Sequence, residues 1–486
     1  MPGLAIAGHP RGPAASISPY SPIPATLFSP SPFTVLDVMV APGLQLSEHP
    51  NLDKYIKDEK LVMSCNFSFR KQPIKALYIL YRFTLLPVLL PWWILRYALP
   101  SWRPRRAWTL AQAVSVRPHS YPHLLFSPVD LSLSSEQNRY MRWLMVIGEN
   151  TGVSGRTHED YNLLRLSSIK DDAGFVLIPP AASTLVVGSI KSYADKAGVR
   201  PETIIGYWFG DSPEEQPVQE DEVVVMNMHG GGYVFGTAHP KDLTASIPRG
   251  LVRHGKRTGT INRVLSIEYR LASSHPFEST GQFPTALLDA LSGYAYLLAQ
   301  GFKPHNILLA GDSAGGNLAS ALTRYLLDAH PPSLAPPAGL VLTSPWADMS
   351  MQHYRRGGSS ETNAACDYIG GSALGGYALV AFLGAHSPRE LLHNPYLSPA
   401  SPFLPPDVRP FDARWPRTMI VCGGAEVMLD EIRSLRHAME TGGVSVTWLE
   451  VEDAVHDFVA VPGFSKQAEL AFEAIVQWVK EGKRDR

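Results

Sequence analysis

The chain has 486 residues, of which 43 are Lys or Arg and 44 are Asp or Glu, and 45% are hydrophobic. This length and apolar content are enough for one large α/β domain with an N-terminal extension. The net charge of -1 offers no basic surface, so no nucleic-acid partner is expected. The three cysteines lie far apart without CxxC spacing, which predicts neither a disulfide framework nor a metal site.

The N-terminal region is predicted to contain a tail and a membrane anchor. The first 45 residues are rich in Pro, Ser, Ala and Gly, which is typical of disordered segments. Residues 76–99 are mostly apolar, long enough to cross a hydrocarbon core of about 30 Å, and end in an aromatic cluster that contains Trp92 and Trp93. We therefore assign residues 1–70 to a disordered tail and residues 71–106 to a membrane anchor segment.

The form of this anchor is left open by its composition. Arg82, Arg96 and two prolines are costly within a simple spanning helix, so an interfacial or re-entrant segment is an alternative to a single pass. Basic residues flank both ends of the stretch and do not determine its orientation. Initiation at Met63 would place the anchor at the N-terminus, and a glycosylation sequon begins at Asn66.

From residue 107 to residue 486 the pattern is that of a globular α/β domain. Short apolar runs predict buried strands, and segments between them have helical periodicity. Strands that alternate with helices indicate a mainly parallel central sheet covered by helices on both faces. The predicted strands are residues 223–228, 264–267, 306–310, 418–422 and 445–449, and the predicted helices are residues 286–299 and 314–327.

The segment Gly311–Gly315 reads Gly-Asp-Ser-Ala-Gly and lies between a predicted strand and a predicted helix. This context is the one that a nucleophile elbow requires, because small residues let the turn close and present the hydroxyl of Ser313 above the sheet. Asp312 belongs to the same turn. Five-residue matches of this kind also occur by chance, so Ser313 needs partners elsewhere in the chain.

A glycine-rich segment, His229–Gly232, directly follows the first of the predicted parallel strands. Glycines allow backbone N–H groups to turn toward one point, which is the composition of an oxyanion hole. Gly230 belongs to this loop, and His229 is expected to brace it by hydrogen bonding. The alternative is a phosphate-binding loop, but the Lys-Ser/Thr pair of a nucleotide P-loop does not follow.

A serine nucleophile requires a histidine base and a carboxylate that orients the base. Glu426 and His456 each lie in a loop after a predicted strand, and the chain order of Ser313, Glu426 and His456 is that of α/β-hydrolases. Asp430 is the second candidate for the acid. Three further carboxylates lie nearby, and each can also be interpreted as ordinary surface charge or a helix cap. These are Glu431, Asp453 and Asp457.

Together these motifs resemble the hormone-sensitive-lipase group of α/β-hydrolases, over roughly residues 223–479. The resemblance implies oxyanion donors at the N–H groups of Gly231, Gly232 and Ala314, and helical cap segments at about residues 110–200 and 351–411. It also places Glu426, Met428 and Asp430 at the positions of the group's D-x-L-x-D element, with Glu in place of the first Asp. Other segments that match are residues 268–272, 275–277, 283–286 and 344–348, with Asp289.

The apolar segment and the following Ser101–Arg106 also resemble fungal membrane-anchored members of this group, including steryl acetyl hydrolases of the endoplasmic reticulum. This resemblance implies a membrane-associated serine esterase that cleaves acetyl or other short-chain esters of hydrophobic alcohols, with no cofactor. Two alternatives remain: an amidase or deacetylase with the same three residues, and a non-catalytic ligand-binding protein of the same fold. Oligomeric state is not predicted.

Overall fold

The computed structural model describes residues 90–115, 174–274, 278–331, 334–369 and 378–484. Several predictions lie outside these ranges and are not addressed by the structure. They concern the tail, residues 71–89 of the anchor, residues 116–173 of the first cap segment, Met63 and Asn66.

The described residues form an eight-stranded sheet with the strand order β1-β2-β4-β3-β5-β6-β7-β8. β2 pairs antiparallel with β1 and β4, and all the other pairs are parallel. The fold class is therefore confirmed as a mainly parallel α/β fold. The strands are β1 (Phe175–Ile178), β2 (Ile204–Gly210), β3 (Val224–Met228), β4 (Arg263–Glu268), β5 (Ile307–Asp312), β6 (Gly339–Thr343), β7 (Thr418–Gly423) and β8 (Val446–Val451).

Burial explains why four of the strands could be predicted. Every residue of β3, β4, β5 and β7 is buried, because helices cover both faces of the sheet, and these strands appear in the sequence as continuous apolar runs. β8 is an edge strand and is only partly buried. All five predicted strands are present within two residues of their predicted ends. β1, β2 and β6 are not among these five, although β6 is also fully buried.

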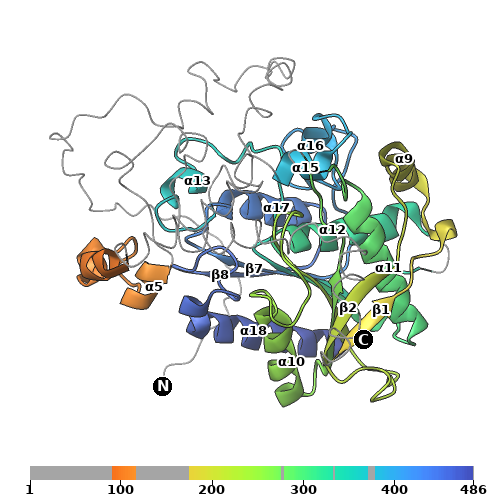
Figure 1. Ribbon diagram of the computed structural model, residues 1–486, viewed down its shortest axis with the longest axis horizontal. Coiled ribbons are helices and arrows are strands. Elements are labelled where there is room, and N and C mark those ends of the chain that lie inside the picture. The colour runs from red at the N-terminus through yellow and green to blue at the C-terminus, as the bar shows by residue number, and fades with distance from the viewer. Residues whose placement is uncertain (1–89, 116–173, 275–277, 332–333, 370–377, 485–486) are drawn as a thin grey trace, which may run out of the picture. The chain divides into compact units, whose positions relative to one another are not determined.

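Helices cover both faces of this sheet (Figure 1). α10 and α18 pack together on one face, and α11, α12 and α17 lie on the other. The predicted helices correspond to α11 and α12. The bounds are α5 (Leu110–Ser115), α9 (Gly188–Ala197), α10 (Ser246–Thr258), α11 (Thr285–Ala299), α12 (Ala314–Ala329), α13 (Ser359–Thr362), α15 (Leu379–Leu383), α16 (Glu390–His393), α17 (Leu429–Thr441) and α18 (Ser465–Arg484). α9 lies in the first predicted cap segment, and α13, α15 and α16 lie in the second.

The described end of the predicted anchor packs against the domain. Residues 90–97 are helical, and Tyr97 and Trp108 belong to the same hydrophobic core cluster as the central strands. Arg103 ties this segment together by donating to the carbonyl oxygens of Tyr97, Ala98 and Trp108 at 2.9, 3.1 and 2.6 Å. Within the described ranges, no helix is both long enough and apolar enough to cross a membrane.

Candidate active site

The register of the parallel strands brings the predicted site residues to one edge of the sheet. Met228 pairs with Gly311, so the glycine-rich loop that follows β3 lies beside the turn that follows β5. Asp312 pairs with Thr343, and the backbone N–H of Ser313 donates to the carbonyl oxygen of Thr343 at 3.0 Å. The carboxyl ends of parallel strands meet at the same edge, which is where ligand sites of open α/β sheets form.

Ser313 occupies a sharp turn between β5 and α12. Its backbone has φ 51° and ψ −116°, a conformation that residues other than glycine rarely adopt. The turn closes because a Cβ at Gly315 would lie only 1.9 Å from the carbonyl oxygen of Met228, so the position needs glycine. α12 begins at Ala314, and its N-terminus directs partial positive charge toward the serine. The predicted nucleophile elbow is therefore present.

The glycine-rich loop is fixed against this turn. The Gly230 N–H donates to Asp312 Oδ2 at 2.9 Å, and the Tyr269 hydroxyl donates to the carbonyl oxygen of His229 at 2.7 Å. The His229 ring stacks on the Tyr269 ring with 4.3 Å between the ring centroids, and its Nδ1 lies 2.7 Å from the carbonyl oxygen of Gly230. His229 thus braces the loop, and Asp312 joins the loop to the turn.

Three backbone N–H groups near this turn remain available. Gly231 has φ 114° and Gly232 has φ 59°, both in the region that favours glycine. Among the described contacts, no acceptor is bound by the N–H groups of Gly231, Gly232 or Ala314. Buried backbone donors are almost always paired, so unpaired donors at one place can serve a ligand or a developing oxyanion.

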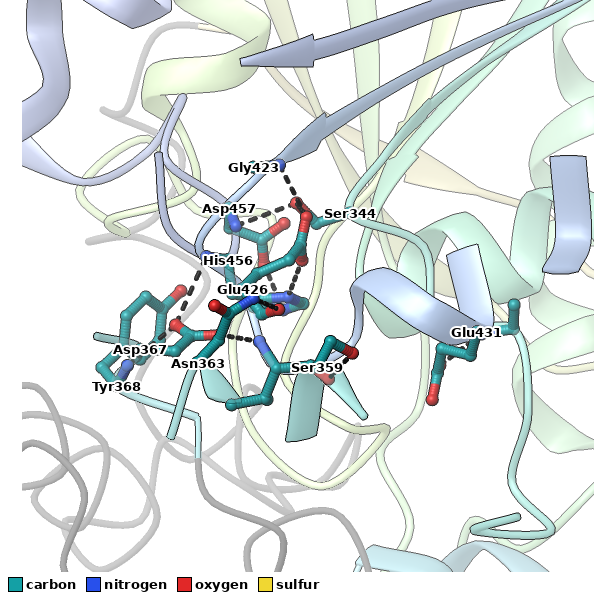
Figure 2. Close-up of polar contacts among 12 residues, drawn as sticks. Ser344, Ser359, Asn363, Asp367, Tyr368, Gly423, Glu426, Glu431, His456 and Asp457 are labelled. Carbon is teal, nitrogen blue, oxygen red and sulfur yellow. Dashed lines mark hydrogen bonds and ion pairs between the residues drawn. The ribbon is translucent and has the colours of Figure 1, made fainter. Parts of the chain in front are cut away.

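Glu426 and His456 contact each other directly (Figure 2). His456 Nδ1 lies 2.9 Å from Glu426 Oε2, and both side chains are fully buried. The other carboxylate oxygen of Glu426 accepts hydrogen bonds from the Gly423 N–H at 2.7 Å and the Ser344 hydroxyl at 3.2 Å. Burial raises the pKa of the Glu426 carboxyl, while the hydrogen bond with His456 opposes this rise. The structure therefore brings together the predicted acid and base.

The second ring nitrogen of His456 faces Asp457. The distance from His456 Nε2 to Asp457 Oδ2 is 3.1 Å, although Nε2 has no partner with hydrogen-bond geometry. Burial alone would lower the pKa of His456, but the carboxylates of Asp457 and Glu426 outweigh burial and raise it well above its ordinary value. The described contacts include no hydrogen bond between His456 and the hydroxyl of Ser313. Such contacts are often long in structures without substrate.

The other candidate carboxylates have different partners. Asp430 Oδ2 accepts the Ser359 N–H at 3.0 Å, and Glu431 Oε1 accepts the Ala347 N–H at 3.0 Å. Asp453 lies 3.5 Å from Arg105 in a partly exposed ion pair. The hydrogen bond with His456 thus distinguishes Glu426 from Asp430.

A further carboxylate beside this pair, that of Asp367, was not predicted from the sequence. Asp367 lies in the second predicted cap segment, is completely buried, and accepts hydrogen bonds from backbone N–H groups of the acid and base loops (Figure 2). Asn363 and Ser359 of this segment bind the acid loop as well. A single Asp within a predicted cap carries no motif, and only the fold places it next to His456.

Two further features bear on cofactors. Within the described residues, no three His, Cys, Asp or Glu side chains are grouped so that they could hold a metal ion. Cys366 and Cys422 are both free and buried, and burial raises the pKa of both thiols. The third cysteine, Cys65, lies outside the described ranges.

The sheet order, the strained serine after β5 and the acid and base after β7 and β8 define an α/β-hydrolase arrangement. A family model for the alpha/beta hydrolase fold matches residues 225–460. An acetyl-hydrolase from Streptomyces hygroscopicus is 30% identical over 260 residues, covering 53% of this chain and 76% of the relative. Esterase LipU from Mycobacterium tuberculosis is 28% identical over 321 residues, covering 64% of this chain and 91% of the relative.

Among solved structures, an esterase/lipase from an uncultured bacterium is similar, with 24% sequence identity and a TM-score of 0.48. The match covers 70% of this chain and 97% of that structure. The chain belongs to the α/β-hydrolases, as the relative that is 30% identical and matched over 76% of its length shows.

Proposed function

We propose that this protein is a serine carboxylic ester hydrolase that uses Ser313 as nucleophile, His456 as general base and Glu426 as the acid. The relatives named acetyl-hydrolase and esterase support ester cleavage. The observation that carries the residue assignment is the 2.9 Å contact of His456 Nδ1 with Glu426, next to the turn that holds Ser313 in a strained conformation.

The reaction follows two acyl transfers. His456 Nε2 exchanges its contact with Asp457 for the Ser313 hydroxyl and removes the proton as Ser313 Oγ attacks the ester carbonyl. The N–H groups of Gly231, Gly232 and Ala314 stabilise the tetrahedral oxyanion, and the alcohol leaves with the proton from His456. Water, deprotonated by His456, then cleaves the acyl-enzyme and releases the acid. Ser313 and His456 supply the nucleophile and the proton transfer, so the scheme requires no cofactor.

The proposed substrates are acetyl or other short-chain acyl esters of hydrophobic alcohols such as sterols or lipids. The name of the Streptomyces relative, acetyl-hydrolase, supports a short acyl group. A hydrophobic alcohol is consistent with the apolar residues 76–99, which we propose associate the protein with a membrane, that of the endoplasmic reticulum, as a single pass or at its surface. In the described end of this stretch, Trp92 and Leu95 are exposed, and such side chains favour a lipid interface.

Replacing the nucleophile tests the activity. Purified Ser313→Ala protein is expected to lose p-nitrophenyl acetate hydrolysis by at least about 10³-fold, because a triad without its nucleophile retains only binding and oxyanion stabilisation. A fluorophosphonate probe should label the wild-type protein and leave Ser313→Ala unlabelled. Wild-type rates in the Ser313→Ala protein would contradict the assignment.

Substrate comparisons then separate the neighbouring functions. A panel of esters that varies the acyl chain and the alcohol should give the highest kcat/KM for acetyl esters of apolar alcohols. A matched anilide that is cleaved faster than its ester would instead indicate an amidase. A wild-type protein that neither hydrolyses esters nor reacts with the probe would indicate a ligand-binding member of the fold.

A further inference from the structure

A short segment of the second predicted cap region lies against both catalytic loops. We call residues 359–368, which include α13, the clamp segment. Figure 2 shows its residues Ser359, Asn363 and Asp367 beside Glu426 and His456, which come from the loops after β7 and β8. Asn363 is 63 residues from Glu426 along the chain, and Asp367 is 89 residues from His456, so only tertiary packing brings them together.

The clamp segment first binds the backbone around Glu426. The Asn363 side-chain amide donates to the carbonyl oxygen of Glu426 at 2.9 Å, and the Ser359 hydroxyl donates to the carbonyl oxygen of Val427 at 2.8 Å. Asp367 Oδ2 accepts the Val427 N–H at 2.8 Å. The peptide groups on both sides of Val427 are therefore held from one segment.

The other oxygen of the same carboxylate reaches the base. Asp367 Oδ1 accepts the backbone N–H of His456 at 3.3 Å and the N–H of Tyr368 at 2.8 Å. Because a carboxylate is rigid and planar, its two oxygens set the spacing between the backbone at Val427 and the backbone at His456. The side chains of Glu426 and His456, which must meet at 2.9 Å, start from these two stretches of backbone.

Resting on the function proposed above, we propose that Asp367 is a positioning residue that sets the geometry of Glu426 and His456 by binding the backbone of both loops. It acts through these residues and does not itself touch the substrate. Burial raises the pKa of Asp367 to about 7, and above that pH its ionised carboxylate accepts hydrogen bonds on both oxygens. An amide instead presents an acceptor on one side and a donor on the other. An amide at position 367 therefore opposes the N–H of one loop with its own N–H groups.

The clamp segment is itself held from the N-terminal side. Arg105 Nη2 donates to Asn363 Oδ1 at 2.7 Å, and Arg105 Nη1 lies 3.5 Å from Asp453 in the base loop. The Trp108 indole N–H donates to the carbonyl oxygen of Asp453 at 2.7 Å. Arg105 thus joins the clamp segment to the loop of His456 along a second route, and its side chain is partly exposed, which makes it accessible to substitution with little loss of core packing.

The central test is the Asp367→Asn protein, measured beside wild type for kcat, KM and Tm with p-nitrophenyl acetate. We expect kcat to fall by about 10²-fold while KM stays near the wild-type value, because displacement of the pair by about 1 Å impairs proton transfer and leaves the substrate pocket intact. A folded Asp367→Asn protein with wild-type kcat would overturn the proposal, as would an equal loss of kcat and of folded protein.

Arg105 provides a second variant in case Asp367→Asn does not fold. Arg105→Met should lower kcat without changing KM. Arg105→Lys should retain part of the wild-type kcat, because the lysine ammonium can still bind Asn363. The adjacent Arg106 is exposed, so Arg106→Met is the matched control and should behave as wild type. Equal kcat values for Arg105→Met and Arg106→Met would contradict the role of the clamp segment.

A substrate-free measurement separates this proposal from the proposed function. The downfield proton resonance of His456 Nδ1–H, assigned by its loss in Glu426→Gln, reports the pair in the absence of any ester. Asp367→Asn should shift or broaden this resonance, and an unchanged resonance would overturn the positioning role even if no ester were hydrolysed. An inactive wild-type protein with a resonance that responds to Asp367→Asn would instead contradict only the catalytic function.

Discussion

At His456, a carboxylate lies near each ring nitrogen, Glu426 at Nδ1 and Asp457 at Nε2. The first contact orients the ring, whereas the second faces the nitrogen that must accept the proton of Ser313. Two negative groups stabilise the imidazolium, and they raise the pKa of His456 although burial would lower it. The acid limb of the pH profile of kcat/KM should therefore lie at a higher pH than the pKa of an ordinary histidine would give.

Replacing Asp457 tests this electrostatic effect. Asp457→Asn removes one carboxylate, so the pKa of His456 should fall and the acid limb of kcat/KM should move to lower pH by about one unit. The carboxylates that still interact electrostatically with His456 are Glu426, Asp367, Asp312 and Glu431. The exposed Glu452 of the same loop serves as control, and Glu452→Gln should keep the wild-type profile. An unmoved acid limb in Asp457→Asn would count against the assignment of His456 as the titrating base.

At the scale of elements, the junction of β5 and α12 is the feature on which the site depends. Its small residues allow α12 to start next to the loop that follows β3, and its signature is local in sequence. This explains why the strand, turn and helix around Ser313 could be predicted from residues 306–327, while its role as nucleophile stays a prediction. The clamp segment is the opposite case, because Asp367 acts through the backbone of two loops that are distant in sequence.

The close approach at Gly315 leads to a stability prediction. In Gly315→Ala the new Cβ would lie 1.9 Å from the Met228 carbonyl oxygen. Neither atom can move away without a shift of the backbone, so the free energy of unfolding should fall by about 3 kcal/mol. Gly198, the C-cap of α9, has φ 67° and open space around its Cβ position. Gly198→Ala should therefore lose only about 1–2 kcal/mol, from backbone strain alone. Urea unfolding of both proteins would show whether contact or strain dominates.

For the whole molecule, Tyr97 at the described end of the predicted anchor and Trp108 just after the anchor belong to the hydrophobic core. Tyr97 and Trp108 are buried in the core cluster, and the Trp108 ring packs edge-on against Phe464 with 5.8 Å between the centroids. The membrane segment and the domain are thus proposed to be continuous, with the boundary at residue 107 still a prediction. The position of an N-terminal truncation should therefore decide whether membrane association alone or also the stability of the core is lost.

Two truncations separate these roles. Removal of residues 1–89 should leave Tm and esterase activity near wild type while the protein no longer sediments with membranes after alkaline carbonate washing. Removal of residues 1–108 should in addition lower the free energy of unfolding by at least about 3–5 kcal/mol, the cost of losing one buried Trp. Sedimentation of the protein that lacks residues 1–108 with membranes would argue against the anchor, and equal Tm values of the two truncated proteins would argue against the role of Trp108 in the core.

The sequence alone determined the parallel α/β fold, because fully buried strands such as β3 and β5 are continuous apolar runs that alternate with helices. It also singled out Ser313, Glu426 and His456 as candidates for nucleophile, acid and base, since each follows a strand and strand ends meet at one edge. β6 and the partners of His456 were decided by tertiary structure. The nitrogen of His456 that Glu426 binds, the approach of Asp457 and the two contacts of Asp367 depend on strand register and on a distant segment, and neither leaves a local pattern in the sequence.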